Sequence, residues 1–210
     1  MIQQFNKHNF QELCNKLAEK DPHLQSILQQ YGHPPIWRRP ASFASIIHII
    51  LEQQVSLASA KAALEKLKEK IGTITAPKLL LLSDAELRAC YFSRQKTTYA
   101  RSLAEAIVTK KLQLGKLGNC PDEEIRTELK KIKGIGDWTV DVYLLFVLQR
   151  ADIFPTGDLA MMNALKNIKQ LPKQVTKESI LEIAEAWRPH RSLATMILWH
   201  HYIKSRNIKI

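Results

Sequence analysis

The sequence predicts an all-α protein, and three observations support this fold class. Apolar residues recur with the 3.6-residue period of a helix in most segments, no series of strand-like alternating segments occurs, and no internal repeat is present. Hydrophobic residues make up 45% and charged residues 24% of the 210 positions. This composition is typical of a folded chain with one or two small lobes and a real core.

Four helices are expected in the first third of the chain. Phe10 opens a short amphipathic segment, and Asp21 can cap the next helix, which has proline in its first turn. The run 32–35, Gly-His-Pro-Pro, interrupts the helical pattern, and Ser42 can cap the helix that follows. We expect these helices at residues 10–20, 22–31, 42–54 and 56–70.

The remainder of the chain is also expected to be helical, with helices of more varied length. Pro121 and Pro155 lie at breaks just ahead of helices, while Gly115 and Gly118 indicate a loop before Pro121. The expected helices span residues 77–82, 84–89, 94–110, 122–132, 138–149, 157–165, 177–187 and 190–206.

The charge balance indicates the class of partner. The net charge is +11, with a pI near 9.6. Lysine and arginine side chains bind phosphates and release condensed counterions, so a polyanion is the expected partner. Basicity alone is weak support, because many basic proteins do not bind nucleic acid.

Three cysteines limit the cofactors that the chain can hold. Cys14, Cys90 and Cys120 are far apart and form no Cys-x-x-Cys pair. Neither a zinc knuckle nor a four-cysteine iron–sulfur cluster is therefore expected. The N-terminus has no apolar signal core, and no run approaches the roughly 18 apolar residues of a membrane helix. We expect a protein that is not secreted, located in the cytoplasm or nucleoid of a prokaryote or the nucleus of a eukaryote.

The most informative segment is LKKIKGIGDWTVDVYLLFVLQRADIFPTGDLAMMNAL, residues 129–165. A tight turn, Gly134-Ile135-Gly136, separates two predicted helices. A carboxylate, Asp158, follows in a polar break between apolar segments. Backbone N–H groups at a helix N-terminus form a ready anion site, so this pattern indicates chemistry beside a bound phosphate chain.

This arrangement resembles the helix-hairpin-helix, Gly/Pro-rich-loop, Asp (HhH-GPD) superfamily of DNA base-excision glycosylases. Further segments resemble its 3-methyladenine DNA glycosylase II branch, in the same order along the chain: residues 21–67, 90–96 and 186–202. The chain resembles a short form without an N-terminal β-domain. The resemblance implies two helical lobes with the active site in the cleft between them. One lobe, residues 42–150, ends in the hairpin, and the other joins 1–41 to 151–210 and carries Asp158.

The resemblance also assigns the chemistry. Asp158 would be the catalytic carboxylate, stabilising the oxocarbenium character of the sugar or orienting water. The structural alternative is that Asp158 only caps the following helix. Bifunctional relatives carry a nucleophilic lysine where this chain has Trp138, so strand cleavage is not expected.

The base pocket would be lined by two tryptophans, Trp138 and Trp199, whose rings suit cationic alkylated purines. The alternative for Trp199 is a core anchor of the last helix. Two further pocket positions that are aromatic in some relatives are Val142 and Leu159 here, which leaves the lesion range open.

Contacts to DNA are expected mainly from the hairpin backbone at Gly134, Ile135 and Gly136, which would bind phosphate oxygens. The wedge that fills the emptied stack would be Phe92 or Arg94, opposite Gln54. Relatives often seat a monovalent cation on hairpin carbonyls, which here would be near Lys130, Ile132 and Ile135. No redox cofactor or catalytic metal is implied. The remaining expected DNA-binding residues are Thr139, Lys96 and Arg191.

The function that follows is monofunctional hydrolysis of the N-glycosidic bond of alkylated purines, such as 3-methyladenine and 7-methylguanine. The base would be flipped out of duplex DNA and an abasic site left behind. We expect a monomer whose partner is duplex DNA with damaged bases, not a membrane. Two alternatives stay open: the same fold acting on hypoxanthine, uracil or an oxidised purine, and a non-catalytic helix-hairpin-helix DNA-binding module.

Overall fold

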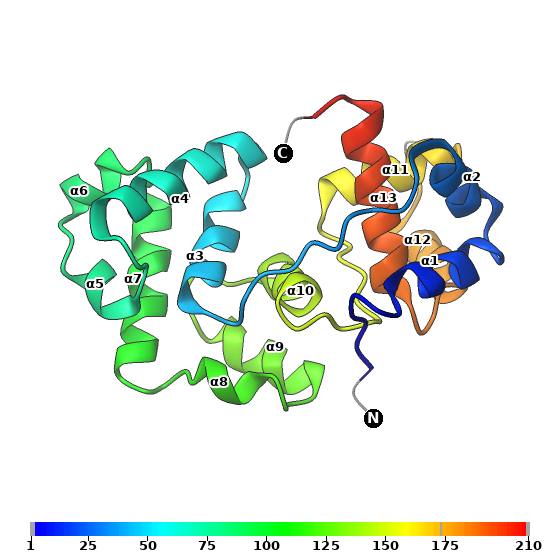
Figure 1. Cartoon of the computed structure of the whole chain (residues 1–210). Coiled ribbons are helices and arrows are strands. Elements are labelled where there is room, and N and C mark those ends of the chain that lie inside the picture. The colour runs from blue at the N-terminus through cyan, green and yellow to red at the C-terminus, as the bar shows by residue number, and fades with distance from the viewer. Residues whose placement is uncertain (1–2, 173, 209–210) are drawn as a thin grey trace. The chain divides into compact units, whose positions relative to one another are not determined.

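The computed structural model describes residues 3–172 and 174–208, and this part of the chain is all-α (Figure 1). It contains thirteen helices and, outside them, one isolated antiparallel bridge between Gln4 and Arg150. The predicted fold class is therefore confirmed. None of the helices in the described ranges is long and apolar enough to cross a membrane.

The chain divides into two compact units. The terminal unit combines Met1–Arg38 with Leu144–Lys209, and the central unit comprises Arg39–Tyr143. We expected the corresponding junctions after residues 41 and 150. The first junction lies in the irregular segment before α3 (Phe43–Glu52), and the second lies inside α10 (Asp137–Phe146).

The core of the central unit is built around α3, which is apolar on most of its surface. Its four isoleucines, Ile46, Ile47, Ile49 and Ile50, are fully buried, as expected for a helix enclosed by others. α3 packs against α4 and α7, and α5 packs against α7. The other helices of this unit are α4 (Leu57–Ile71), α5 (Ala76–Leu80), α6 (Asp84–Ala89), α7 (Arg94–Val108), α8 (Leu114–Leu117) and α9 (Asp122–Lys130).

Serine side chains start four of these helices. Each accepts a hydrogen bond from the backbone N–H three residues later, which satisfies one of the unpaired donors of the first turn. At α6 the reciprocal bond from Glu86 completes a capping box. The four capping residues are Ser42, Ser56, Ser83 and Ser93.

The expected loop before Pro121 is wrong in one respect. Residues Leu114–Leu117 form the single helical turn α8, with Gly115 inside it and Gly118 after it. Buried Leu117 anchors this turn. A single apolar anchor produces no periodic pattern, so the two glycines were the only local signal and they indicated a loop.

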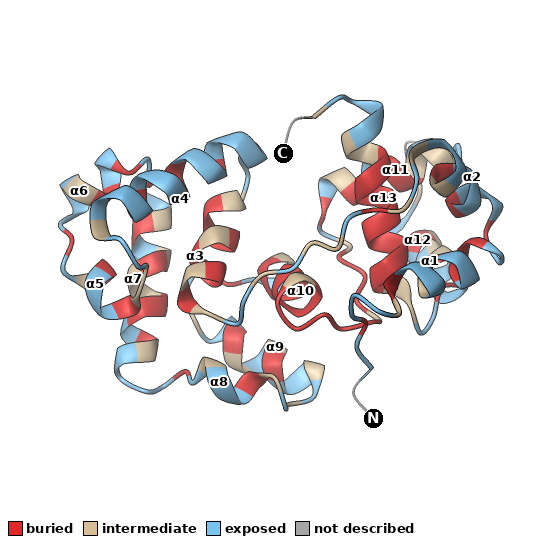
Figure 2. Cartoon of the chain, in the orientation of Figure 1, coloured by how far each residue is buried: buried red, intermediate tan, exposed pale blue. Residues whose placement is uncertain are grey.

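The terminal unit is built around α13 (Arg191–Ser205). Residues 192–201 are all buried, and Figure 2 shows this buried stretch along the helix. α1, α2 and α11 all pack against α13. The remaining helices of this unit are α1 (Phe10–Ala18), α2 (Pro22–Tyr31), α11 (Leu159–Ile168) and α12 (Lys177–Glu185).

Asp21 joins three segments of the terminal unit. One carboxylate oxygen caps α2 by accepting from the N–H groups of His23 and Leu24. The other accepts from Lys169 Nζ and Trp187 Nε1, both at 2.8 Å. Burial raises the pKa of Asp21, but the bonds from Lys169 and Trp187 and the lysine charge outweigh it, so the net shift is downward.

Candidate active site

The predicted hairpin lies in the central unit between α9 and α10. Gly134 at its turn has φ +88°, a left-handed conformation that favours glycine. A Cβ added to Gly134 would lie 2.0 Å from Cγ of Tyr99 on α7, so the ring excludes any larger residue there. Gly136 has open space around the equivalent position. Two independent constraints therefore act on the first glycine of the turn, and neither acts on the second.

A glutamine that the sequence analysis did not single out holds this hairpin in place. Gln53, at the C-terminal end of α3, donates through Nε2 to the carbonyl of Gly134 and to Oγ1 of Thr139, both at 2.9 Å. Thr139 is 2% exposed. The expectation that Thr139 contacts DNA is therefore wrong for this structure, since its side chain is buried and bonded to Gln53. The Gln53-Gln54 pair at the end of a predicted helix was the available signal.

The three predicted backbone donors differ. The N–H of Ile135 bonds to the carbonyl of Ile132 at 3.1 Å, and the Ile135 side chain is buried, so this residue closes the turn. Gly134 is half-buried and Gly136 is exposed. An ion pair between Lys130 and Asp137 spans the hairpin, with 2.6 Å between Nζ and Oδ1.

Two exposed turns of the central unit contain residues with positive φ. Gln54 follows α3 with φ +56°, and Tyr91 precedes α7 with φ +64°. Arg94, the first residue of α7, is exposed, as expected for a residue that meets DNA. Phe92 is 3% exposed, whereas Tyr91 is 62% exposed. Phe92 as the wedge is therefore a wrong expectation: its ring belongs to the core, and the exposed ring of this turn is that of Tyr91.

Two predicted phosphate-binding cations are used inside the fold. Lys96 Nζ donates to the carbonyl of Leu51 at 2.6 Å, and burial lowers its pKa. Arg191, in the terminal unit, binds both carboxylate oxygens of Asp152, with 2.7 Å from Nε to Oδ1 and 2.9 Å from Nη2 to Oδ2. The prediction from sequence could not see these partners, which lie far away along the chain.

Asp141, a second acid of this segment on α10, has a structural partner. Its carboxylate bonds to the guanidinium of Arg126, which joins α9 to α10. Burial raises the pKa of Asp141, and the charge of Arg126 opposes that rise.

Asp158 lies in the terminal unit at the start of α11. Its Oδ1 accepts from the backbone N–H of Met161 at 2.8 Å and from Nε1 of Trp199 at 2.9 Å. The carboxylate is thus a helix cap, as the structural alternative predicted, but it is also held by an indole from α13. Asp158 is 8% exposed, while the next residue, Leu159, is 79% exposed. A fixed carboxylate therefore lies beside a side chain that points to the surface.

An aromatic cluster surrounds the Trp199 indole. The ring of Phe146 is 5.2 Å from that of Trp199, and the ring of Trp37 is 6.4 Å away, edge-on. Trp199 is 8% exposed, so it is both a core residue of α13 and the partner of Asp158. Trp37 was missed by sequence reasoning, although a tryptophan just after Pro34-Pro35 was a usable signal.

The two other predicted pocket residues lie on α10 in the central unit. Trp138 is half-buried, and Val142 is 2% exposed. Trp138 is the position at which the resemblance implied a lysine in bifunctional enzymes. Neither α10 residue supplies an amine nucleophile.

Comparisons with known proteins agree with this geometry. A family model described as "HhH-GPD superfamily base excision DNA repair protein" matches residues 47–189. The chain is 34% identical over 190 residues to DNA-3-methyladenine glycosylase 1 of Schizosaccharomyces pombe, covering 87% of this chain and 82% of that protein. It is 30% identical over 184 residues to the putative DNA-3-methyladenine glycosylase YfjP of Bacillus subtilis. That match covers 84% of this chain and spans 64% of the relative's length.

A solved structure is similar as well. The Schizosaccharomyces pombe 3-methyladenine DNA glycosylase (Mag1) in complex with abasic DNA has a TM-score of 0.79 and 27% identity. The match covers 90% of this chain and 95% of that one. The chain therefore belongs to the HhH-GPD superfamily of base excision DNA repair proteins.

Proposed function

We propose that this chain is a monofunctional DNA glycosylase that releases alkylated purines, of the 3-methyladenine and 7-methylguanine type, from duplex DNA. The observation that carries the proposal is Asp158, a carboxylate fixed by the Met161 N–H and the Trp199 indole. Plain phosphate binding needs no such carboxylate. The names of the similar proteins, which act on 3-methyladenine, support the same reading.

The proposed reaction is hydrolysis at C1′ of the flipped nucleotide. As the bond to the base lengthens, the bonding electrons leave with the base and positive charge develops on the sugar. The Asp158 carboxylate stabilises that charge, and water then adds to C1′ and loses a proton. An alkylated purine is already cationic, so it leaves without a strong general acid. The proposal assigns Trp138 and Trp199 to the stacking of this base.

The absence of an amine nucleophile at Trp138 supports hydrolysis alone. A lysine at that position would form a Schiff base with C1′ and allow strand cleavage. We expect no borohydride-trapped protein–DNA adduct and no strand cleavage above background. Trapping of such an adduct would contradict the monofunctional assignment.

Two further features belong to the proposal. A monovalent cation would sit on hairpin carbonyls near Lys130, Ile132 and Ile135. The carbonyl of Ile132 already accepts the Ile135 N–H, and a carbonyl oxygen has a second lone pair for a cation. The protein would act as a monomer.

The test is single-turnover release of free bases from methylated duplex DNA by wild type and Asp158→Asn. Asparagine keeps an Oδ1 acceptor for Met161 and Trp199, so the variant removes the charge and preserves the cap. We expect the rate to fall by about 10³-fold. Affinity for a duplex containing a stable abasic-site analogue, measured in parallel, should stay close to that of wild type.

Three results would redirect the proposal. If the wild type releases no methylated base, duplexes with hypoxanthine, uracil and oxidised purines test the other lesions, which the non-aromatic Val142 and Leu159 leave open. If none of these bases is released, the chain is a DNA-binding module. Undiminished release by Asp158→Asn would show that this carboxylate is only a cap.

A further inference from the structure

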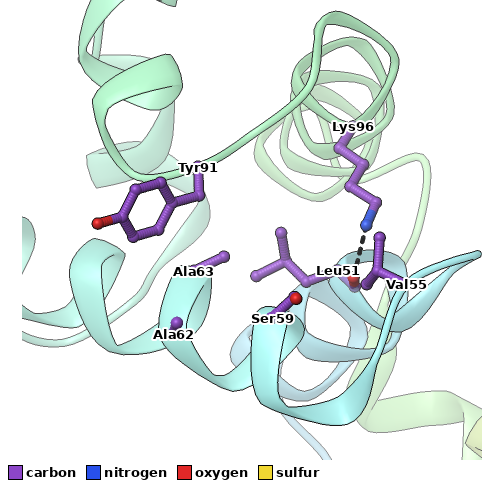
Figure 3. Close-up of a pocket in the computed structure, with 7 residues that line it drawn as sticks. All are labelled: Leu51, Val55, Ser59, Ala62, Ala63, Tyr91 and Lys96. Atoms are coloured by element: carbon purple, nitrogen blue, oxygen red, sulfur yellow. Dashed lines mark hydrogen bonds between the residues drawn. The ribbon is translucent and has the colours of Figure 1, made fainter.

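A pocket with a volume of about 290 Å³ opens on the central unit, and none of the residues assigned to base release is among those described as lining it (Figure 3). Its floor is apolar, with Leu51 from α3 and Ala62 and Ala63 from α4. Figure 3 shows the Tyr91 ring on one side of this floor and the Lys96 side chain on the other. The pocket therefore combines an apolar floor, an aromatic wall and a cation.

The rim of the pocket exposes apolar side chains that water does not favour. Tyr91 is 62% exposed, and Val55, which also lines the pocket, is 46% exposed. The two turns that carry them are strained, because Gln54 next to Val55 and Tyr91 itself have positive φ. Exposed apolar residues and backbone strain gathered at one place indicate a binding surface rather than a packing accident.

The polar groups of the pocket suit a ligand with hydrogen-bond acceptors. Lys96 uses one ammonium proton on the carbonyl of Leu51, and an ammonium has three donors. Ser59 adds a hydroxyl at the wall. None of the described lining residues is a carboxylate, and the whole chain carries a charge of +11.

We propose that this pocket receives the base left unpaired when the damaged base is flipped out, with the Tyr91 ring stacked on it and Lys96 donating to one of its acceptors. The inference rests on the proposed function, since only a flipped duplex has such a base. Every base has a π-face for stacking, and guanine, cytosine and thymine offer keto oxygens to a lysine. The damaged base itself is excluded as the occupant because its sugar must lie near a carboxylate, which this pocket lacks.

The test compares two duplexes that both contain a stable tetrahydrofuran abasic-site analogue. One has thymine opposite the analogue, and the other has a second tetrahydrofuran there, so that the base is absent. Stacking in the pocket should make wild type bind the thymine duplex about tenfold more tightly. This assay measures binding alone and requires no catalysis. A negative result would therefore contradict the pocket inference without bearing on base release, which the single-turnover assay tests separately.

Variants of the pocket residues test whether the preference for the thymine duplex arises in this pocket. Tyr91→Gly removes the ring and relaxes the turn, while Ala62→Leu, at an exposed helical position, fills the pocket beneath an intact ring. Both should bring the affinity ratio close to one, and Tyr91→Phe should retain it. Leu81→Ala, at a residue of the same unit that is 84% exposed and outside the pocket, should leave it unchanged.

Three results would overturn the inference. One is a wild-type ratio near one. A second is a loss of affinity for both duplexes alike in Tyr91→Gly, which would make Tyr91 a plain wedge. The third is a wild-type ratio in Ala62→Leu, which would show that the pocket beneath the ring stays empty.

Discussion

Asp21 and Asp158 share one local arrangement within the terminal unit. Each caps a helix, each is nearly buried, and each accepts an indole N–H from a tryptophan far away along the chain. The indole belongs to Trp187 for Asp21 and to Trp199 for Asp158. Capping and burial therefore do not separate the two aspartates.

Their neighbours do separate them. The Asp21 carboxylate also binds Lys169, and the Trp187 beside it is 1% exposed and packs edge-on against Phe154. Asp158 is followed by Leu159, which is 79% exposed, and its indole adjoins the half-buried Trp37. The same local pattern can thus serve a closed structural junction or a carboxylate at the edge of the core.

The largest expected difference is in catalysis. Asp158→Asn should lower single-turnover base release by about 10³-fold, equivalent to about 4 kcal/mol, since it removes the charge from the proposed site. Asp21→Asn is the matched control, because it makes the same change in the same local arrangement. Asp21→Asn should leave the rate of base release per folded molecule unchanged. An equal loss of rate in both variants would show that the two aspartates do not differ in function.

Substitution of the two tryptophan partners should show the same difference in base release, with a smaller loss of rate. Trp199→Phe removes the donor to Asp158 and should reduce base release by about 10²-fold, because the carboxylate loses its orientation. Trp187→Phe removes the donor to Asp21 and should affect only the free energy of unfolding, by about 2 kcal/mol. Rates and urea unfolding of both variants check this, and a slower rate in Trp187→Phe alone would contradict it.

Asp21→Asn should reduce the free energy of unfolding by about 2 kcal/mol at neutral pH, since it leaves the Lys169 ammonium without its anionic partner. The pKa of Asp21 is lowered from its ordinary value of 3.8, so folding favours the ionised form. Its contribution is present above that value and is lost as pH falls through the lower folded pKa. Urea unfolding from neutral to acidic pH should show the wild type and the variant converging, and a constant difference would exclude the linkage.

Lys169→Met should produce the smallest effect, a loss of about 1 kcal/mol in the free energy of unfolding. The variant keeps an unbranched side chain near the Trp187 ring, which the lysine ammonium approaches to 5.8 Å. The pKa of Asp21 should rise, because burial then acts with less opposition. NMR titration of the Asp21 carboxyl checks this direction. An unchanged pKa would show that the indole and backbone hydrogen bonds keep the pKa low without Lys169.

Local patterns predicted most of the fold. Serine and aspartate caps, prolines and the apolar period located the helices, with ends within a few residues of those observed, because these signals act within one turn of the chain. α8 was missed because its single apolar anchor has no period. The hairpin turn was found from its two glycines alone.

The site residues were predicted less completely than the helices. Asp158 and Trp199 meet as partners, and Gln54 and Arg94 are exposed, but three expected DNA-contacting side chains are engaged or buried within the fold. Thr139 is bonded to Gln53, Arg191 is bonded to Asp152, and Phe92 is buried. Lys96 is bonded to the Leu51 carbonyl and keeps further ammonium donors. A polar or aromatic residue type in a sequence does not show whether a distant partner already satisfies it.

The sequence by itself determined the helices, the family, the basic charge and the identity of the candidate carboxylate, because periodicity, caps and motifs are properties of short segments. Tertiary structure alone decided that Gly134 must be glycine beneath Tyr99, that Gln53 braces the hairpin, and that Trp37 joins the aromatic cluster. These are contacts between segments that are distant along the chain. Their formation depends on how whole helices pack, and no local pattern records it.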